Sequence, residues 1–423
     1  MATPRLVLVD QRPRTAALAA LSGAMEARPA TASVPVAFAP PGLRLAAAVL
    51  EAARGGTVIV GWSFTTLGFP VAAAARRELA GELARTLGTA GEVLHVAGGP
   101  HPTADPGGTL EAGFDLAATG EGEETLVGLL TRLATGGDVT GPGLAWREAG
   151  RLVRGAPPLP VDLDACPPFP ERLPRLGPIE ITRGCAHACR FCQTTHLHGG
   201  RVRHRSLARI TGAARSVVER GGRDVRFVTP SALAWGSEDG SPRLEAIEEL
   251  LRRVREAAGS GARIWFGTFP SEVRPEHVTP EVLRILRRHV ANDHLAIGAQ
   301  SGSDAVLDAC HRGHRAEDVR RAVRLAREAG FRAKVDLIFG LPGETPDDAQ
   351  ASRALAVELS DLGAEIHAHA FLPLPGTPWA REEPGQIDLA TRRLLEELAG
   401  RGKASGPWRR QEQVARAHPG ASG

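Results

Sequence analysis

The chain has 423 residues, a hydrophobic fraction of 43% and a formal net charge of only +3, values typical of a globular protein with two or three domains. This balance gives no signal of nucleic-acid binding, and no apolar run approaches the roughly 18 residues of a membrane-spanning helix. The chain runs directly into a strand pattern and contains five cysteines, three of them clustered. We therefore expect a reducing, cytoplasmic environment and metal binding in place of disulfides.

The first third of the chain alternates short apolar runs with helical stretches. We predict strands at 5–9, 34–38, 57–60, 93–97 and 114–118, with helices at 15–27, 43–53, 71–87 and 123–134. This alternation predicts an α/β domain over residues 1–138, with a doubly wound, Rossmann-like parallel sheet covered on both faces. Ligands of such sheets bind beyond the carboxyl ends of the strands.

Three of these strand ends are rich in glycine and small polar residues, at 61–63, 98–102 and 120–123. Glycine lets the backbone approach a ligand closely. Short turns between strands and helices explain the same glycines equally well, so the glycines alone leave both interpretations open.

A connector over residues 139–178 follows. Its first part predicts a small hairpin, with strands at 143–147 and 151–154 around Ala149-Gly150. Its second part is rich in proline, which predicts a semi-rigid, extended segment. Cys166 lies there, and we interpret it as a plain thiol because a role as a metal ligand would need the linker to fold back.

The second half of the chain resumes the alternation. Strands are predicted at 179–182, 225–229, 263–268, 294–300, 333–339 and 365–371, with helices at 207–220, 243–257, 280–288, 316–329 and 347–362. Six such units predict a partial (β/α)6 TIM-type barrel over residues 179–380, with its active site at the carboxyl ends of the strands. The tail, 381–423, contains one predicted helix at 390–399 and then a Gly/Arg/Pro-rich end typical of a frayed terminus.

The cysteines Cys185, Cys189 and Cys192, spaced C-x3-C-x2-C, directly follow the first barrel strand. Three thiolates can hold three corners of an iron–sulfur cube and leave the fourth iron open to another ligand. Structural zinc is the alternative, but zinc prefers four protein ligands, so one histidine of the loop would have to join: His187, His196 or His198.

Residues 178–378 closely resemble the radical SAM family, on the loop Gly184-Cys185-x-x-x-Cys189-x-Phe191-Cys192 and on the segments 336–345 and 371–378. The resemblance implies a [4Fe-4S] cluster on the three cysteines, with S-adenosyl-L-methionine (SAM) on the fourth iron. It also implies SAM contacts from residues at the cysteine loop and the strand ends: Phe191, Thr229, Gln300, Ser301, Asp336 and Leu372. The Gly-Gly-Glu element that often follows the second strand is absent, which leaves the contact to the SAM amino group unassigned.

Residues 5–134 resemble the cobalamin-binding domain that precedes many radical SAM domains, on the three glycine-rich strand ends. The resemblance implies cobalamin contacts from Ser63, Gly98, Gly99, Gly120 and Glu121. Many such domains carry Asp-x-His-x-x-Gly after the first strand, but here Arg12 stands in place of the cobalt-ligating histidine. Arginine stays protonated and cannot ligate, so this domain either binds cobalamin without that ligand or serves as a scaffold.

Together the two resemblances imply a cobalamin-dependent radical SAM methyltransferase of class B. It would cleave SAM to a 5′-deoxyadenosyl radical and methylate an unactivated carbon, with flavodoxin or ferredoxin as a reductant. The alternatives are another radical SAM reaction, such as rearrangement or sulfur insertion, and a non-catalytic iron–sulfur protein. No residue set predicts the substrate, and we interpret Cys310 as a plain thiol.

Overall fold

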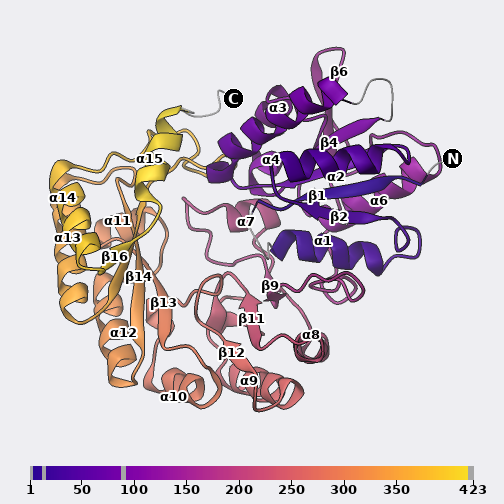
Figure 1. Ribbon diagram of the computed structural model, residues 1–423. Helices are drawn as coiled ribbons and strands as arrows, with labels where there is room; N and C mark the ends of the chain where they lie inside the picture. Colours follow the sequence, from indigo (N-terminus) through magenta and orange to yellow (C-terminus); the bar gives the residue numbers. More distant parts are fainter. Residues whose placement is uncertain (1–2, 12–15, 87–91, 418–423) are drawn as a thin grey trace. The chain divides into compact units, whose positions relative to one another are not determined.

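The computed structural model describes residues 3–11, 16–86 and 92–417. The chain divides into two compact units, Met1–Pro178 and Ile179–Gly423, which we describe separately (Figure 1).

The first unit is built on a seven-stranded sheet with the order β2-β1-β3-β4-β5-β6-β7. Its parallel strands are β1 (Arg5–Val9), β2 (Val36–Ala39), β3 (Val58–Ser63), β4 (Val93–Gly98) and β5 (Leu116–Ala118). The order 2-1-3-4-5 is that of flavodoxin-like folds, in which the strand order reverses between β1 and β3 and ligands bind at that reversal. The predicted doubly wound fold is therefore confirmed.

Helices cover both faces of this sheet because the side chains of each strand alternate between two cores. Val7 and Val9 of β1 pack into one core with residues of the helices at 43–53 and 69–86, whereas Leu6 and Leu8 pack into the other with residues of the helices at 16–26 and 122–134. The helices are α1 (Ala16–Glu26), α2 (Leu43–Ala53), η1 (Thr66–Gly68), α3 (Phe69–Thr86), α4 (Pro100–Ala104), α5 (Pro106–Glu111) and α6 (Gly122–Ala134).

The connector packs on the first unit. The predicted hairpin forms from β6 (Leu144–Glu148) and β7 (Arg151–Arg154), and β6 pairs antiparallel with β5, so the hairpin extends the sheet. In the proline-rich part, Cys166 is buried in a small apolar cluster with Ala24 and Val161.

The second unit contains two parallel sheets that together make an open barrel. β8 (Ile179–Glu180), β11 (Asp224–Val228) and β12 (Arg263–Trp265) form one sheet. The other contains β13 (His294–Gln300), β14 (Arg332–Phe339), β15 (Glu365–Ala370) and β16 (Ala404–Ser405). A parallel bridge between Val273 and Ile297 connects the segment after β12 to β13. A short antiparallel pair, β9 (Thr182–Arg183) and β10 (Arg203–His204), flanks the cysteine loop. The predicted partial barrel is confirmed.

The five helices predicted between the barrel strands are present, together with shorter helices that the sequence did not predict. They are α7 (Gln193–His198), α8 (Leu207–Glu219), η2 (Ala232–Ala234), α9 (Leu244–Ala258), η3 (Pro275–His277), α10 (Pro280–His289), α11 (Asp304–Ala309), α12 (Ala316–Glu328) and α13 (Pro346–Asp361). In β14, Val335 and Leu337 are fully buried, whereas Lys334 and Asp336 alternate with them and point to the opposite, inner face of the barrel.

We expected a frayed end after residue 399, but the described residues there form regular structure, so this expectation was wrong for them. After α14 (Leu389–Gly400), β16 pairs in parallel with β15, and α15 (Trp408–Ala417) follows. The side chain of Gln411 accepts a hydrogen bond from the Ala370 N–H at 3.0 Å, so α15 is tied to the end of β15. A two-residue strand is too short to produce an alternating pattern, which is why the sequence did not predict it.

Candidate functional site

The cysteine loop leaves the first barrel strand through a glycine that no other residue could replace. Gly184 has φ +86°, and a Cβ there would lie 2.4 Å from the Arg201 carbonyl oxygen. The loop then places Cys185, Cys189 and Cys192 on the wall of one cavity of about 240 Å³.

The three cysteines fit an iron–sulfur cluster by their chemistry. All are free thiols lining the same cavity, and burial raises the pKa of Cys192, with further repulsion from Cys189 and Cys185. The three thiols are therefore placed on one wall, where they can converge on a single metal group. Three convergent soft ligands with room beside them match a cluster that keeps one iron open.

Arg312 is a cationic side chain that lines this cavity, as does Arg274, and sequence inspection did not identify it. Its Nη1 lies 3.7 Å from Cys189 Sγ, and its Nη2 donates to the Gly298 carbonyl at 2.7 Å. A Cβ on Gly298 would lie 2.5 Å from Arg312 Nη2, so the glycine in β13 makes room for the guanidinium. A buried positive charge beside a sulfur favours the thiolate that binds metal.

Glu272 also lines the cavity. Burial, and then the nearby Asp336 carboxylate, raise its pKa to about 7, while Arg312 acts in the opposite direction. The segment from Phe266 to Val273 that holds Glu272 lies after β12, outside any regular strand, so periodicity could not place it.

Three of the six residues expected to contact SAM line the cavity with the cysteines: Phe191, Thr229 and Gln300. Gln300 adopts φ +74° at a β-bulge after Gly298. Such a bulge changes the direction of a side chain at the end of a strand, here that of Gln300 in β13. Ser301, Asp336 and Leu372 do not line the cavity. Ser301 is fully buried, with its Oγ 3.2 Å from Ser352 Oγ, and so holds α13 against the end of β13.

Of the three histidines considered as a fourth zinc ligand, one lies at the cavity. Among the described residues, His187 lines the cavity, whereas His196 and His198 lie on α7 outside its lining. Burial, and then Arg274, lower the pKa of His187 to about 4.

Cys310 is a buried thiol whose Sγ donates to the Val306 carbonyl at 2.8 Å, and burial raises its pKa to about 12, so it is a structural residue.

In the first unit, the expected cobalamin residues gather at the carboxyl edge of the sheet. Ser63 and Gly98 are paired neighbours at the ends of β3 and β4. Gly99 has φ +103°, and a Cβ there would lie 2.8 Å from the Phe64 carbonyl oxygen. The Gly120 N–H donates to Thr103 Oγ1 at 3.0 Å, and the Glu121 carboxylate accepts from the Val161 N–H at 2.8 Å, which holds the connector.

The same edge has unsatisfied polar atoms at the end of β1. Asp10 and Arg175 form an ion pair at 2.9 Å, yet within the described part of the chain Asp10 Oδ1, Gln11 Nε2 and Arg175 Nε are buried without a hydrogen-bond partner. Buried polar atoms without partners call for an additional group. Arg12, where a cobalt-ligating histidine would stand, lies outside the described residues.

Solved structures share this architecture over nearly the whole chain. The radical SAM methyltransferase TsrM from Kitasatospora setae, with cobalamin and a [4Fe-4S] cluster bound, has a TM-score of 0.69, with 21% identity, 90% of this chain covered and 75% of its own. The cobalamin-dependent SAM radical enzyme OxsB has a TM-score of 0.64, with 15% identity, 84% of this chain covered and 52% of its own. At these identities the likeness shows the fold.

Curated relatives include enzymes named for methylthio modification of tRNA. A tRNA-2-methylthio-N(6)-dimethylallyladenosine synthase from Cereibacter sphaeroides is 30% identical over 301 residues, which are 67% of this chain and 64% of the relative. A threonylcarbamoyladenosine tRNA methylthiotransferase from Thermotoga maritima is 28% identical over 230 residues, 53% of this chain and 50% of the relative. The chain therefore spans from half to just under two thirds of these relatives.

Residues 179–356 match the Radical SAM superfamily model. Barrel, cysteine loop and cavity together define the second unit as a radical SAM domain. Residues 179–356 therefore form a domain of the Radical SAM superfamily. Enzymes of this superfamily use a [4Fe-4S] cluster and SAM and need a reductant. Among the described residues, no helix is both long and apolar enough to cross a membrane.

Proposed function

We propose that this protein is a cobalamin-dependent radical SAM methyltransferase that methylates an unactivated carbon. The observation that carries the proposal is the combination, in one chain, of the three-cysteine cavity with a doubly wound first unit in the order 2-1-3-4-5. The solved structures with this architecture include the methyltransferase TsrM with cobalamin and a [4Fe-4S] cluster bound.

The residues of the second unit would bind and orient the reactants. When bound, the reduced cluster supplies the electron that cleaves SAM, and cobalamin carries the methyl group. Cys185, Cys189 and Cys192 would hold the cluster and leave one iron open to the amino and carboxylate groups of SAM. Phe191 and Gln300 wall the same cavity, and Arg312 would offset the negative charge of the cluster at Cys189.

The carboxyl edge of the first sheet would hold the corrinoid. Ser63, Gly98, Gly99 and Gly120 keep that edge free of large side chains, and the unpartnered atoms of Asp10, Gln11 and Arg175 can hydrogen-bond a polar ligand. Glu121 stays a candidate corrinoid contact, and its carboxylate also accepts a hydrogen bond from the Val161 N–H.

Methylthiolation is the second candidate, and the identity to two methylthiotransferases favours it. This reaction inserts sulfur, so the chain would need a place for a sulfur donor. The two cysteines outside the loop, Cys166 and Cys310, are both buried in apolar clusters. We therefore favour methylation, with flavodoxin or ferredoxin as the reductant.

The test does not require the substrate. Anaerobically reconstituted protein is incubated with SAM and dithionite, with and without hydroxocobalamin, and S-adenosylhomocysteine and 5′-deoxyadenosine are measured. We expect S-adenosylhomocysteine to form only when hydroxocobalamin is present, and 5′-deoxyadenosine in both cases. Formation of S-adenosylhomocysteine at equal rates without the corrinoid would support methylthiolation instead.

A further inference from the structure

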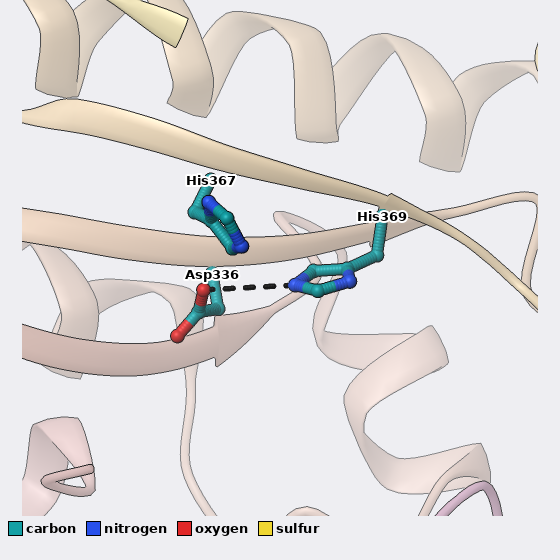
Figure 2. Close-up of side chains that lie close together, drawn as sticks. All are labelled: Asp336, His367 and His369. Atoms are coloured by element: carbon teal, nitrogen blue, oxygen red, sulfur yellow. Dashed lines mark ion pairs between the residues drawn. The ribbon is translucent and has the colours of Figure 1, made fainter. Parts of the chain in front are cut away.

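Two histidines and an aspartate lie together on the inner face of the barrel, outside the lining of the cysteine cavity. Figure 2 shows His367 and His369 of β15 beside Asp336 of β14. One ligand atom of each lies within 4.8 Å of the others, and His369 Nε2 is 3.7 Å from Asp336 Oδ1. Two histidines and one carboxylate are a common ligand set for divalent metals. Whether these three side chains can bind a metal depends on which ring nitrogens carry protons.

The hydrogen bonds around His369 place its proton on Nε2. The Gln411 amide oxygen accepts from the Ala370 N–H at 3.0 Å, which orients the amide. The Gln411 NH₂ group therefore faces His369 Nδ1, at 3.2 Å. An amide NH₂ only donates, so His369 Nδ1 must accept, and in the neutral ring the proton lies on Nε2.

The hydrogen bonds around His367 impose the opposite tautomer. Glu365 Oε1 lies 3.1 Å from Lys334 Nζ, one of the two lysines in the chain, and accepts from Ser405 Oγ at 2.6 Å. Burial raises the pKa of Glu365, but the hydrogen bond from Ser405 and the charge of Lys334 outweigh it, so the pKa is lowered and the group is ionised. Because the Ser405 proton points to Glu365, Ser405 Oγ accepts from His367 Nδ1–H, at 3.1 Å. The lone pair of His367 therefore lies on Nε2.

These tautomers disfavour a metal site. A ligating histidine donates its second ring N–H to an acceptor. His367 does so through Ser405 and Glu365, but His369 faces a donor and its Nε2 carries a proton. We propose that His367 Nε2 and His369 Nε2–H form an acceptor–donor pair that binds a neutral amide edge of the substrate. The amide N–H would donate to His367 Nε2, and the amide C=O would accept from His369 Nε2–H.

The position of the pair supports a ligand-binding role. The side chain of His369 is 25% exposed, and Asp336 acts electrostatically on Glu272, which lines the cysteine cavity. The groups facing His367 are Asp336, His369, Lys334 and Glu365, and burial lowers its pKa below the usual value, so the ring is neutral at pH 7. A neutral His367 ring can accept a hydrogen bond from an uncharged N–H donor. That the ligand is the substrate rests on the proposed function, whereas the tautomers do not.

The test uses the full-length, cluster-reconstituted protein labelled with ¹⁵N-histidine. We expect NMR to show the Nε2–H tautomer for His369 and the Nδ1–H tautomer for His367. Addition of 2-pyrrolidone, a lactam, should shift both Nε2 signals saturably, and Ser405→Ala should weaken this response. Unchanged signals on adding 2-pyrrolidone would overturn the proposal, and S-adenosylhomocysteine formation tests the proposed function separately.

Gln411→Glu provides the matched variant. A carboxylate at 411 would still accept the Ala370 N–H but would also accept from His369 Nδ1–H, which reverses that tautomer and creates a metal-binding set. We expect the variant to bind Co²⁺ about 10–100-fold more tightly than the wild type, seen as paramagnetic broadening of the His367 and His369 signals. Equal Co²⁺ binding by the two proteins at these residues would overturn the proposal.

Discussion

The two units carry their candidate sites in different ways. In the second unit the site is made of specific side chains: three cysteines, Arg312 and Glu272 line one cavity with defined chemistry. In the first unit the site is an edge of small residues and unpartnered polar atoms, with Arg12 where a ligating side chain would stand. An iron–sulfur cluster needs specific side-chain donor atoms such as thiolates. A large organic cofactor, in contrast, can be held mainly by backbone groups and by the shape of the site.

The largest expected effect is at the cysteines. Cys189→Ala removes one of three cluster ligands, so 5′-deoxyadenosine formation from SAM and dithionite should fall below detection, at least ~10³-fold. Cys166→Ala, in the first unit, is the matched control and should keep both cluster absorbance and product. Retention of product in Cys189→Ala would remove the cluster assignment.

Corrinoid binding at the carboxyl edge of the first sheet should depend on the size of the side chains there more than on their chemical groups. Ser63→Trp places a large side chain at the carboxyl end of β3 and should reduce corrinoid retention at least ~10-fold, without loss of 5′-deoxyadenosine formation. Thr57→Trp, at the opposite end of the same strand, should retain corrinoid like the wild type, and circular dichroism checks the fold of both. If both variants bind corrinoid equally, that edge is not the binding site.

Arg312 should affect the cluster without being required for it. Arg312→Gln removes the positive charge beside Cys189 Sγ but can still donate to the Gly298 carbonyl. We expect the rate of 5′-deoxyadenosine formation to fall about 10–100-fold, together with a more negative cluster potential, because the reduced cluster loses a nearby cation. An unchanged potential in anaerobic redox titration would contradict the electrostatic role.

The smallest effect concerns Glu344, in the 336–345 segment. Burial raises its pKa to about 7 although its Oε2 accepts from the Gly340 N–H at 2.7 Å. A carboxyl with a raised folded-state pKa contributes stability below its unfolded pKa and loses that contribution as pH rises through the folded pKa. Relative to Glu344→Gln, the wild type should therefore lose on the order of 2 kcal/mol of unfolding free energy between pH 4.5 and pH 7.5. Equal pH slopes in urea titrations would contradict this.

Much of the fold was predictable because the spacing of apolar residues along a segment indicates which of its side chains are buried. The predicted strand at 5–9 and helix at 43–53 coincide with β1 and α2, since their apolar periods match the two cores of the sheet. Likewise the predicted helix at 347–362 agrees with α13 to within one residue at each end, and Thr345 caps it by accepting from the Asp348 N–H. The short strand β16 was missed because two residues carry no period.

The cysteine site was predictable because its ligands are adjacent in sequence. Arg312 and Glu272 were not, since irregular segments after α11 and β12 bring them to the cavity from distant positions. His367 and His369 had a usable signal: their spacing of two within a strand places both on one face. Their tautomers depend on Gln411 and Ser405, which only the tertiary structure places beside them.

The most direct test of the central claim is the absorption spectrum of protein purified anaerobically, reconstituted with iron and sulfide, supplied with hydroxocobalamin and passed through gel filtration. We predict that the iron–sulfur shoulder and the corrinoid bands elute together with the protein. An iron–sulfur shoulder without any corrinoid band would contradict the account and leave the first unit as a scaffold.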